Sequence, residues 1–290
     1  MRLYQLIFTF LIPFIALAQD KPYEFIGLLE LNDKSVISYQ IKFSINNDNS
    51  ISGISVSDIL GADETKSTIE GRIDKKNKLI EIREVDLVYT KSILDPDLFC
   101  NLRFKIPLKK DDYSSDFTGY YPDSSYCIDG KLHLKNIEKM SEFYDKVIKK
   151  AITLESKDKI KTEDLAKVKE RLNVPKIAPV RLTSNEKLKY TCRDSLVTVY
   201  IWDEAKEDGD EVEVVFNNTL YKKVVASATK AQFTLQLNQG YNVIEVRAIN
   251  QGKIAPNTVS LEVKNSSRKI EINNRLNKNE SSYIHIYYKR

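Results

Sequence analysis

The side chains that most often carry out catalysis are scarce in this sequence. Its 290 residues include only three cysteines and two histidines. A catalytic cysteine needs a base close by to activate it, and His133 and His285 are the two imidazoles that could serve. The sequence therefore gives thiol chemistry little support and favours a noncatalytic protein.

Long apolar runs and charge of one sign are scarce as well. Beyond residue 18, no stretch approaches the ~20 apolar residues that a membrane-spanning helix needs. The 45 basic and 41 acidic residues give a net charge of +4 and are interspersed. They lack the clustered basic stripe that is typical of nucleic-acid-binding proteins. We expect no membrane span in the mature chain and no nucleic-acid partner.

Residues 1–18 have the pattern of a signal peptide. Arg2 precedes an apolar run from Leu6 to Leu17, and Ala16-Leu17-Ala18 matches a cleavage site with Gln19 as the first mature residue. A retained anchor is the alternative, although the run is short for one. We expect export to the periplasm or the exterior, and a composition rich in Lys, Ile and Asn indicates a bacterial source.

The cysteines of an exported chain are expected to meet an oxidising compartment. Cys100 and Cys127 fall in the same predicted domain, so their pairing in a disulfide is plausible. Such a bridge would stabilise the domain by about 3 kcal/mol in the chain-entropy model. Cys192 is then left over and is expected to be a small buried hydrophobe.

Residues 19–135 alternate between apolar and polar side chains, which is typical of half-buried strands. About eight short strands follow one another through hairpin-sized loops, near residues 25–30, 37–45, 51–56, 68–74, 79–89, 102–108, 117–120 and 128–134. Meanders with this many strands commonly close into up-and-down barrels. In this architecture the domain is similar to the small barrels of the avidin and lipocalin type, although no binding motif of theirs is matched.

An eight-stranded barrel is either packed with side chains or holds one small ligand. If it holds a ligand, the aromatic residues Tyr39, Phe43, Phe104 and Tyr120 are predicted to line the pocket. If it is packed, the same residues belong to its core, where most large apolar side chains lie.

Residues 136–176 change to a helical period. Apolar residues recur at spacings of three and four from Ile137 to Ala151, which predicts an amphipathic helix that begins after Asn136. A second helix is predicted after Thr162, and Pro175 and Pro179 end helical structure. This segment is expected to be a charged helical linker, either a spacer or a helix that binds a partner.

Residues 177–290 return to the period of strands. Seven or eight strands in about 110 residues predict an immunoglobulin-like β-sandwich. The last strand, around Ile284 and Ile286, is expected to complete a sheet. The whole chain is therefore predicted to be mainly β, with an N-terminal barrel, a helical connector and a C-terminal sandwich.

An acidic segment separates two of the predicted sandwich strands. Residues 203–210 contain five carboxylates and Gly209. Together with its surroundings, this segment resembles an accessory Ig-like or C2-like β-sandwich module of secreted bacterial proteins. The matching elements are Val199–Asp203, Asp208-Gly209-Asp210, Phe216-Asn217-Asn218, Ala248–Gly252 and Pro256-Asn257-Thr258. Two positions depart from the usual pattern of the module, namely Glu204-Ala205 and Ala255. The resemblance implies a module without catalytic activity.

Asp203, Asp208, Asp210 and Asn250 are the candidate ligands for calcium, which prefers six to eight oxygen ligands. Their spacing is not that of an EF-hand. The alternative is a simple hairpin turn in which Gly209 has a positive φ and the aspartates bind the amides of the turn.

Three functions are compatible with these features. The leading hypothesis is a noncatalytic protein whose barrel binds a small ligand, a peptide or a surface partner, with the sandwich as an accessory docking module. The alternative is a calcium-dependent protein of adhesion or surface assembly. A carbohydrate-active enzyme comes third, because it needs only two carboxylates and Glu81, Glu84, Asp86 and Asp95 are available.

Overall fold

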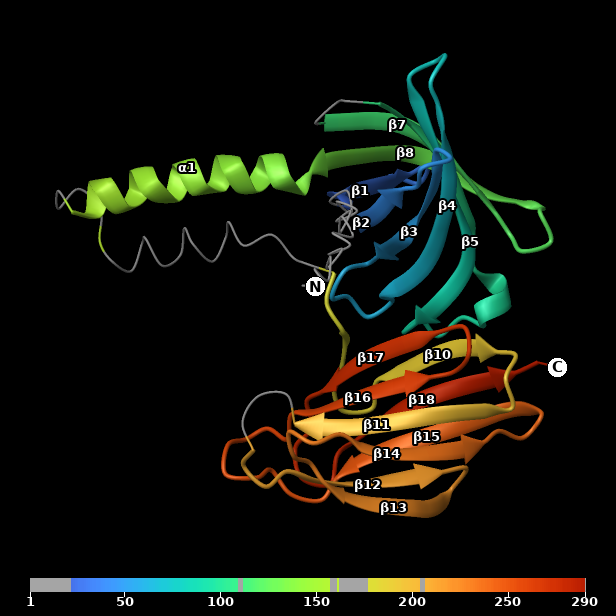
Figure 1. Cartoon of the computed structure of the whole chain (residues 1–290), viewed down its shortest axis with the longest axis vertical. Coiled ribbons are helices and arrows are strands. Elements are labelled where there is room, and N and C mark those ends of the chain that lie inside the picture. The colour runs from blue at the N-terminus through green and yellow to red at the C-terminus, as the bar shows by residue number, and fades with distance from the viewer. Residues whose placement is uncertain (1–21, 109–111, 157–160, 162–176, 204–206, 290) are drawn as a thin grey trace, which may run out of the picture.

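The computed structural model describes residues 22–108, 112–156, 161, 177–203 and 207–289. The predicted signal peptide and the helix predicted after Thr162 lie outside the described residues. The protein is mainly β, with 61% of the structure in strands and 6% in helices. Figure 1 shows the N-terminal strands above the C-terminal ones and one helix that leads away from both.

The N-terminal strands form a closed antiparallel barrel of eight strands, as predicted. Each strand pairs with the next along the chain, and β8 pairs with β1 to complete the circle. The strands are β1 (Tyr23–Leu31), β2 (Val36–Ile45), β3 (Ser50–Ser57), β4 (Thr65–Asp74), β5 (Leu79–Thr90), β6 (Asn101–Pro107), β7 (Asp112–Tyr120) and β8 (Tyr126–Asn136). A short 3-10 helix, η1 (Pro96–Leu98), lies between β5 and β6.

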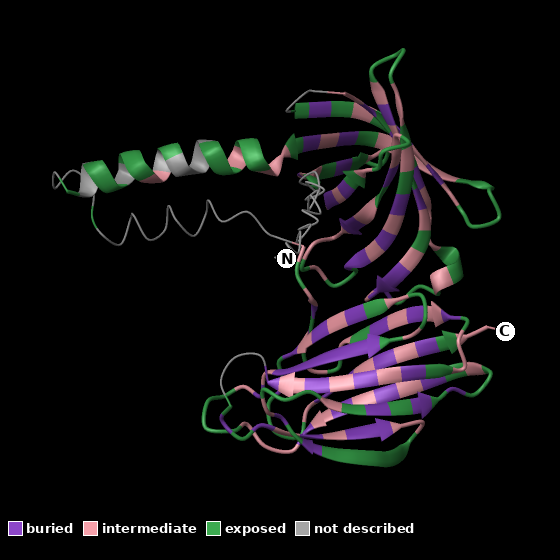
Figure 2. Cartoon of the chain, viewed as in Figure 1, coloured by how far each residue is buried: buried purple, intermediate pink, exposed green. Residues whose placement is uncertain are grey.

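Side chains fill the interior of the barrel. Buried and exposed residues alternate along its strands, as the bands in Figure 2 show. Phe25, Tyr39, Phe43 and Phe117 expose 1% of their surface or less, which leaves no water-sized space against them. The Phe25 ring packs on the rings of Phe43 and Tyr113, with centres 6.0 and 5.1 Å apart. These residues are therefore packed like the core of a globular domain.

The helix α1 (Ile137–Glu155) follows β8 directly, where the sequence predicts it. The Asn136 Oδ1 accepts a hydrogen bond of 3.2 Å from the backbone N–H of Lys139, which is the contact of an N-cap residue. Among the described residues, no helix has both the length and the apolar character needed to cross a membrane.

Among its described residues the C-terminal unit has ten strands, two or three more than the seven or eight that the sequence predicts. The first sheet has the order β13-β12-β15-β18-β10, and the second has the order β14-β11-β16-β17-β9. Both contribute to one hydrophobic core. The strands are β9 (Val180–Leu182), β10 (Lys187–Cys192), β11 (Leu196–Asp203), β12 (Glu211–Phe216), β13 (Thr219–Val225), β14 (Ala231–Gln236), β15 (Gly240–Ala248), β16 (Val259–Lys264), β17 (Lys269–Asn274) and β18 (Ser281–Tyr288).

Strand β5 belongs to both halves of the molecule. Its first residues pair with β6 and close the barrel, while Thr90 pairs with Lys189 of β10. Val88 and Tyr89 are part of the C-terminal hydrophobic core. The barrel and the first sheet are therefore continuous, as one sheet of 13 strands.

Arg268, in the turn between β16 and β17, fastens this junction. Its Nη1 donates to the backbone carbonyls of Leu87 and Thr191, at 2.9 and 3.0 Å, and its Nη2 pairs with Asp86. The side chain is only 18% exposed. One guanidinium thus holds β5 and β10 together.

We expect Arg268→Met to lower the free energy of unfolding by about 1.5–3 kcal/mol, because hydrogen bonds from a charged donor are lost and two carbonyls lose their partner. The control is Arg72→Met, which removes an ion pair with Glu81 whose arginine is 77% exposed. It should cost less than about 1 kcal/mol. Urea unfolding measures both, and equal losses would contradict the role given to Arg268.

The last strand, β18, lies inside the first sheet between β15 and β10. Its residue His285 is next to Lys189 of β10, and the Tyr241 hydroxyl contacts its Nδ1. Burial, and after it the charges of Lys187 and Lys189, lower the pKa of His285 to about 4. The imidazole is therefore neutral in the folded protein at neutral pH.

This lowered pKa predicts a dependence of stability on pH. The pKa of His285 is about 4 in the folded protein and about 6.5 in an unfolded chain, so the unfolded chain binds more protons between these values. The contribution of His285 to the free energy of unfolding is therefore fully present above pH 6.5 and is lost as the pH falls toward 4. His285→Gln should flatten this dependence by roughly 1–2 kcal/mol, with solvent screening allowed for. Denaturant unfolding across this window measures it, and unchanged pH profiles would refute it.

Candidate functional site

The acidic segment crosses from one sheet of the C-terminal unit to the other. Asp203 ends β11 in the second sheet, and β12 begins at Glu211 in the first sheet. Gly209 has a φ of +92°, a conformation that side chains other than that of glycine rarely adopt. The positive φ agrees with the turn alternative, but the hairpin is wrong, because β11 and β12 do not pair.

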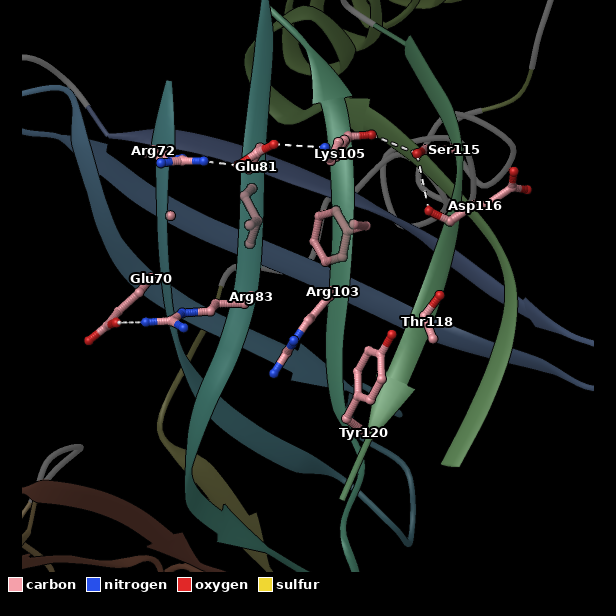
Figure 3. Close-up of a pocket in the computed structure, with 13 residues that line it drawn as sticks. Glu70, Arg72, Glu81, Arg83, Arg103, Lys105, Ser115, Asp116, Thr118 and Tyr120 are labelled. Carbon is pink, nitrogen blue, oxygen red and sulfur yellow. Dashed lines mark hydrogen bonds and ion pairs between the residues drawn. The ribbon is translucent and has the colours of Figure 1, made fainter. Parts of the chain in front are cut away.

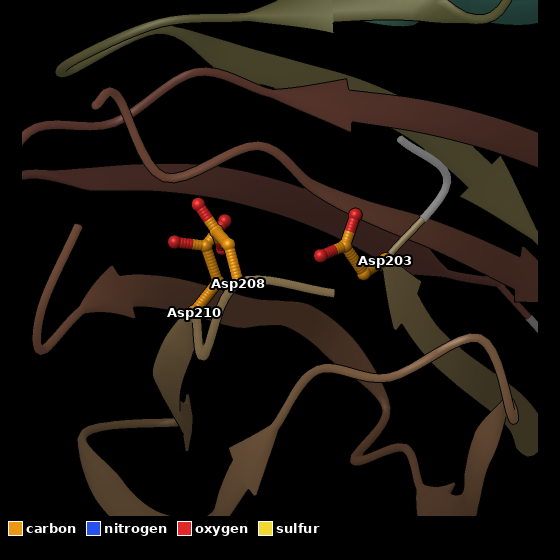
Figure 4. A group of neighbouring side chains, drawn as sticks. All are labelled: Asp203, Asp208 and Asp210. Atoms are coloured by element: carbon orange, nitrogen blue, oxygen red, sulfur yellow. The ribbon is translucent and has the colours of Figure 1, made fainter. Parts of the chain in front are cut away.

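Three carboxylates meet at this crossing. One oxygen each from Asp203, Asp208 and Asp210 can be chosen so that all lie within 4.8 Å of one another. In Figure 4, Asp208 and Asp210 stand side by side and Asp203 faces them from the end of β11. The three residues are only 6%, 9% and 1% exposed. The structure thus brings together three of the four predicted ligands in a place shielded from water.

The loop that follows β15 holds two of these carboxylates in place. The Oδ2 of Asp208 accepts a hydrogen bond from the N–H of Ile254, and the Oδ2 of Asp210 accepts one from the N–H of Thr258, both at 2.8 Å. Among the described residues, the Oδ1 of Asp208 and the Oδ1 of Asp210 have no hydrogen-bond donor. Each of these aspartates therefore keeps one buried oxygen free for a cation.

The same loop packs so closely that it requires a glycine. A Cβ on Gly252 would lie 2.3 Å from the Asp208 Oδ1, and the φ of Gly252 is +58°. A side chain at this position would push into the carboxylate cluster.

The side-chain amide of Asn250 is bound to the backbone of the loop, so its oxygen is not free to bind a cation. Its Oδ1 accepts from the N–H groups of Glu211 and Gly252, at 2.8 and 3.2 Å, and its Nδ2 donates to the carbonyl of Gly209 at 2.9 Å. Asn257, which sequence reasoning does not single out as a ligand, is fully buried. Its Oδ1 has no hydrogen-bond donor among the described residues, and the N–H of its neighbour Thr258 binds Asp210, so Asn257 is a further amide candidate.

The electrostatics of the cluster favour a positive ion. Burial, and then the charges of Asp208 and Asp203, raise the pKa of Asp210. Bringing negative charges together away from water is costly unless a counter-charge joins them. An oxygen-only set of donors suits a hard cation such as calcium.

The aromatic residues predicted to line a ligand pocket lie in two different places. Tyr39, Phe43 and Phe104 are in the packed interior of the barrel, at most 4% exposed. The Tyr39 and Phe104 rings contact each other edge to face, with centres 6.2 Å apart. Tyr120 lies at a groove in the barrel wall.

This groove lies on the outer side of β4, β5, β6 and β7 and has a volume of about 840 Å³ (Figure 3). Acidic and basic side chains alternate across it. Glu81 pairs with Lys105 at 2.7 Å and with Arg72 at 3.0 Å, and their hydrogen bonds lower the pKa of the Glu81 carboxyl. The Arg103 guanidinium lies 4.5 Å from the centre of the Tyr120 ring.

Two of the carboxylates proposed for glycoside hydrolysis, Glu81 and Glu84, do not share a cleft. Glu84 points into the barrel, where the Tyr39 and Ser55 hydroxyls and the N–H of Leu102 donate to it at 2.8, 2.6 and 2.9 Å. Burial raises the pKa of this carboxyl. Glu81 lines the groove on the outer side, so the two carboxyls lie on opposite sides of the wall.

The cysteines behave as the sequence predicts. Cys100, just before β6, forms a disulfide with Cys127 of β8, with their Cα atoms 6.1 Å apart. Cys192 is free and buried, and the Asn265 Nδ2 donates to its Sγ at 3.0 Å.

No protein-family model, no curated protein and no solved structure matches this chain. The resemblances to accessory β-sandwich modules and to avidin-type barrels therefore stay predictions. Support for a function comes from the geometry of the carboxylate cluster and the groove.

Proposed function

We propose that this is an exported, noncatalytic protein whose C-terminal unit binds a calcium ion through Asp203, Asp208 and Asp210. One observation carries the proposal: three buried carboxylates offer oxygens within 4.8 Å of one another. Close carboxylates repel each other, and a bound cation removes that repulsion. The ion would tie the end of β11 to the start of β12 and to the loop that holds both.

Calcium suits this site better than magnesium does. Calcium accepts six to eight oxygens in irregular arrangements, whereas magnesium demands a near-ideal octahedron and retains several waters. The three aspartates supply one oxygen each. The Oδ1 of Asn257, backbone carbonyls and water are the donors that we propose complete the shell.

The wider role that we propose is adhesion or assembly at the bacterial surface. The signal-peptide pattern of residues 1–18 supports export, as does the disulfide between Cys100 and Cys127, because disulfides persist in oxidising compartments. The two sheets around one core support an immunoglobulin-like sandwich that acts as an accessory docking module.

A ligand-binding barrel is the second candidate function. Because side chains fill the interior of the barrel, we propose that a ligand binds at its outer wall. The groove at Tyr120 is the feature that favours this function.

Calcium at a hundredfold excess over its dissociation constant should stabilise the protein by about 2.7 kcal/mol, which raises the melting temperature by roughly 5–10 °C. Asp210→Asn should abolish this shift. In the presence of a chelator the variant should melt at or above the wild-type temperature, because it removes one of three mutually repelling charges. Calorimetric melting with calcium and with chelator measures both effects.

The matched control is Asp112→Asn, the same change at an exposed aspartate at the start of β7. This variant should keep the full calcium shift. The calcium proposal fails if the wild type does not respond to calcium, or if Asp210→Asn responds as strongly as Asp112→Asn.

A further inference from the structure

The groove on the barrel wall contains two neighbouring arginines, of which Arg103 has no ion pair with a carboxylate in the described part of the chain. Arg83 of β5 lies directly opposite Arg103 of β6, and both are exposed on the outer side of the barrel. Like charges in this cross-strand position destabilise a sheet. The neighbouring row differs, because there Glu81 faces Lys105 and pairs with it at 2.7 Å.

Three acidic residues line the groove, Glu70, Glu81 and Asp116, and in the part of the chain that the structure describes none of them pairs with Arg103. Glu81 is shared by Lys105 and Arg72. Glu70 pairs with Arg83 at 3.2 Å, an exposed contact of the kind that contributes little stability. Among the residues that the structure describes, no ion pair joins Arg103 to a carboxylate. The positive charge of Arg103 is therefore available to bind an anion. Arg83 can also bind it, because loss of the exposed ion pair with Glu70 costs little free energy.

Tyr120 holds the Arg103 guanidinium in a defined position. The guanidinium lies 4.5 Å from the centre of the Tyr120 ring, and a cation stacked on an aromatic ring is attracted to its face. Among the described residues the Arg103 guanidinium makes no hydrogen bond, so its N–H groups are available to an anion. A planar fork that is already held in place loses little entropy when it binds a ligand.

The scaffold below this pair is braced by the disulfide. Tyr120 pairs with Asn101, the residue after Cys100. A Cβ added to Gly119, the neighbour of Tyr120, would lie 3.3 Å from the Cys100 Cβ. The bridge from Cys100 to Cys127 thus ties the ends of β6 and β8 together beside Tyr120.

A hydroxyl completes the row of donors. Thr118 of β7 lies opposite Arg103, on the side away from Arg83. Arg83, Arg103 and Thr118 consequently form one line across three strands, with Tyr120 beside it (Figure 3). Arginine forks match the paired oxygens of carboxylates and phosphates.

We propose that this row is a binding site for an oxyanion group, a carboxylate or a phosphate, carried by a polar ligand. The anion lies between Arg83 and Arg103, and the acidic residues of the groove accept hydrogen bonds from hydroxyl groups on the rest of the ligand. The site is independent of the calcium cluster, which lies in the C-terminal unit.

Three sugars that differ in one group test the site by titration calorimetry on the purified full chain. They are glucuronate with a carboxylate, glucose 6-phosphate with a phosphate, and neutral glucose. At least one of the two anions should bind tenfold or more tightly than glucose, and the tighter of them identifies the source of the oxyanion. If neither anion binds more tightly than glucose, the proposal is overturned.

Variants locate the site. Arg103→Met should weaken binding of the anion at least tenfold, and Arg103→Lys, which keeps the charge without the planar fork, should lie between it and the wild type. Arg72→Met is the control, because Arg72 lies in the same groove but is paired with Glu81; binding should stay within twofold. Melting temperatures show whether each variant is folded. Equal losses for Arg72→Met and Arg103→Met would contradict a specific site.

Discussion

The C-terminal unit buries three carboxylates where the chain crosses between its two sheets. Asp203, Asp208 and Asp210 offer oxygens within 4.8 Å of one another, which is unfavourable in a poorly solvated place. The surrounding loop is shaped to hold them, since the N–H groups of Ile254 and Thr258 each bind one carboxylate oxygen. The oxygens that these amides leave free are the reason to propose a cation.

The barrel differs from the C-terminal unit, because its candidate site lies on its outer wall. It is also joined to the first sheet of the C-terminal unit. Its interior is a packed core in which even the polar group Glu84 is satisfied by three donors. Strand β5 closes this barrel and also pairs with β10, so the groove on the barrel wall and β12, which follows the acidic segment, belong to one sheet of 13 strands. The two binding sites that we propose would suit the role proposed for the protein, which is to connect partners at a surface.

Much of the fold could be predicted because it is encoded locally. In a strand with one buried face, apolar and polar residues alternate along the sequence. This alternation is sufficient to predict all eight strands of the barrel. Neither β9 nor β10 is predicted from the sequence. β9 has only three residues, and β10, although it alternates, pairs with β18 and β5, which are far from it in the sequence. The composition of residues 203–210 indicates the acidic cluster, but the hydrogen bonds of Asn250 and the unpaired oxygen of Asn257 depend on how two loops meet. The groove at Arg103 had no signal in the sequence, since it arises from the register of four strands.

A calcium titration of the chelator-treated protein by isothermal calorimetry tests the carboxylate cluster most directly. We expect one calcium ion to bind per chain, and magnesium at the same concentration to bind far more weakly. A chain that takes up no calcium would contradict the calcium proposal, because the three buried carboxylates would then be held together without the counter-charge that their geometry calls for.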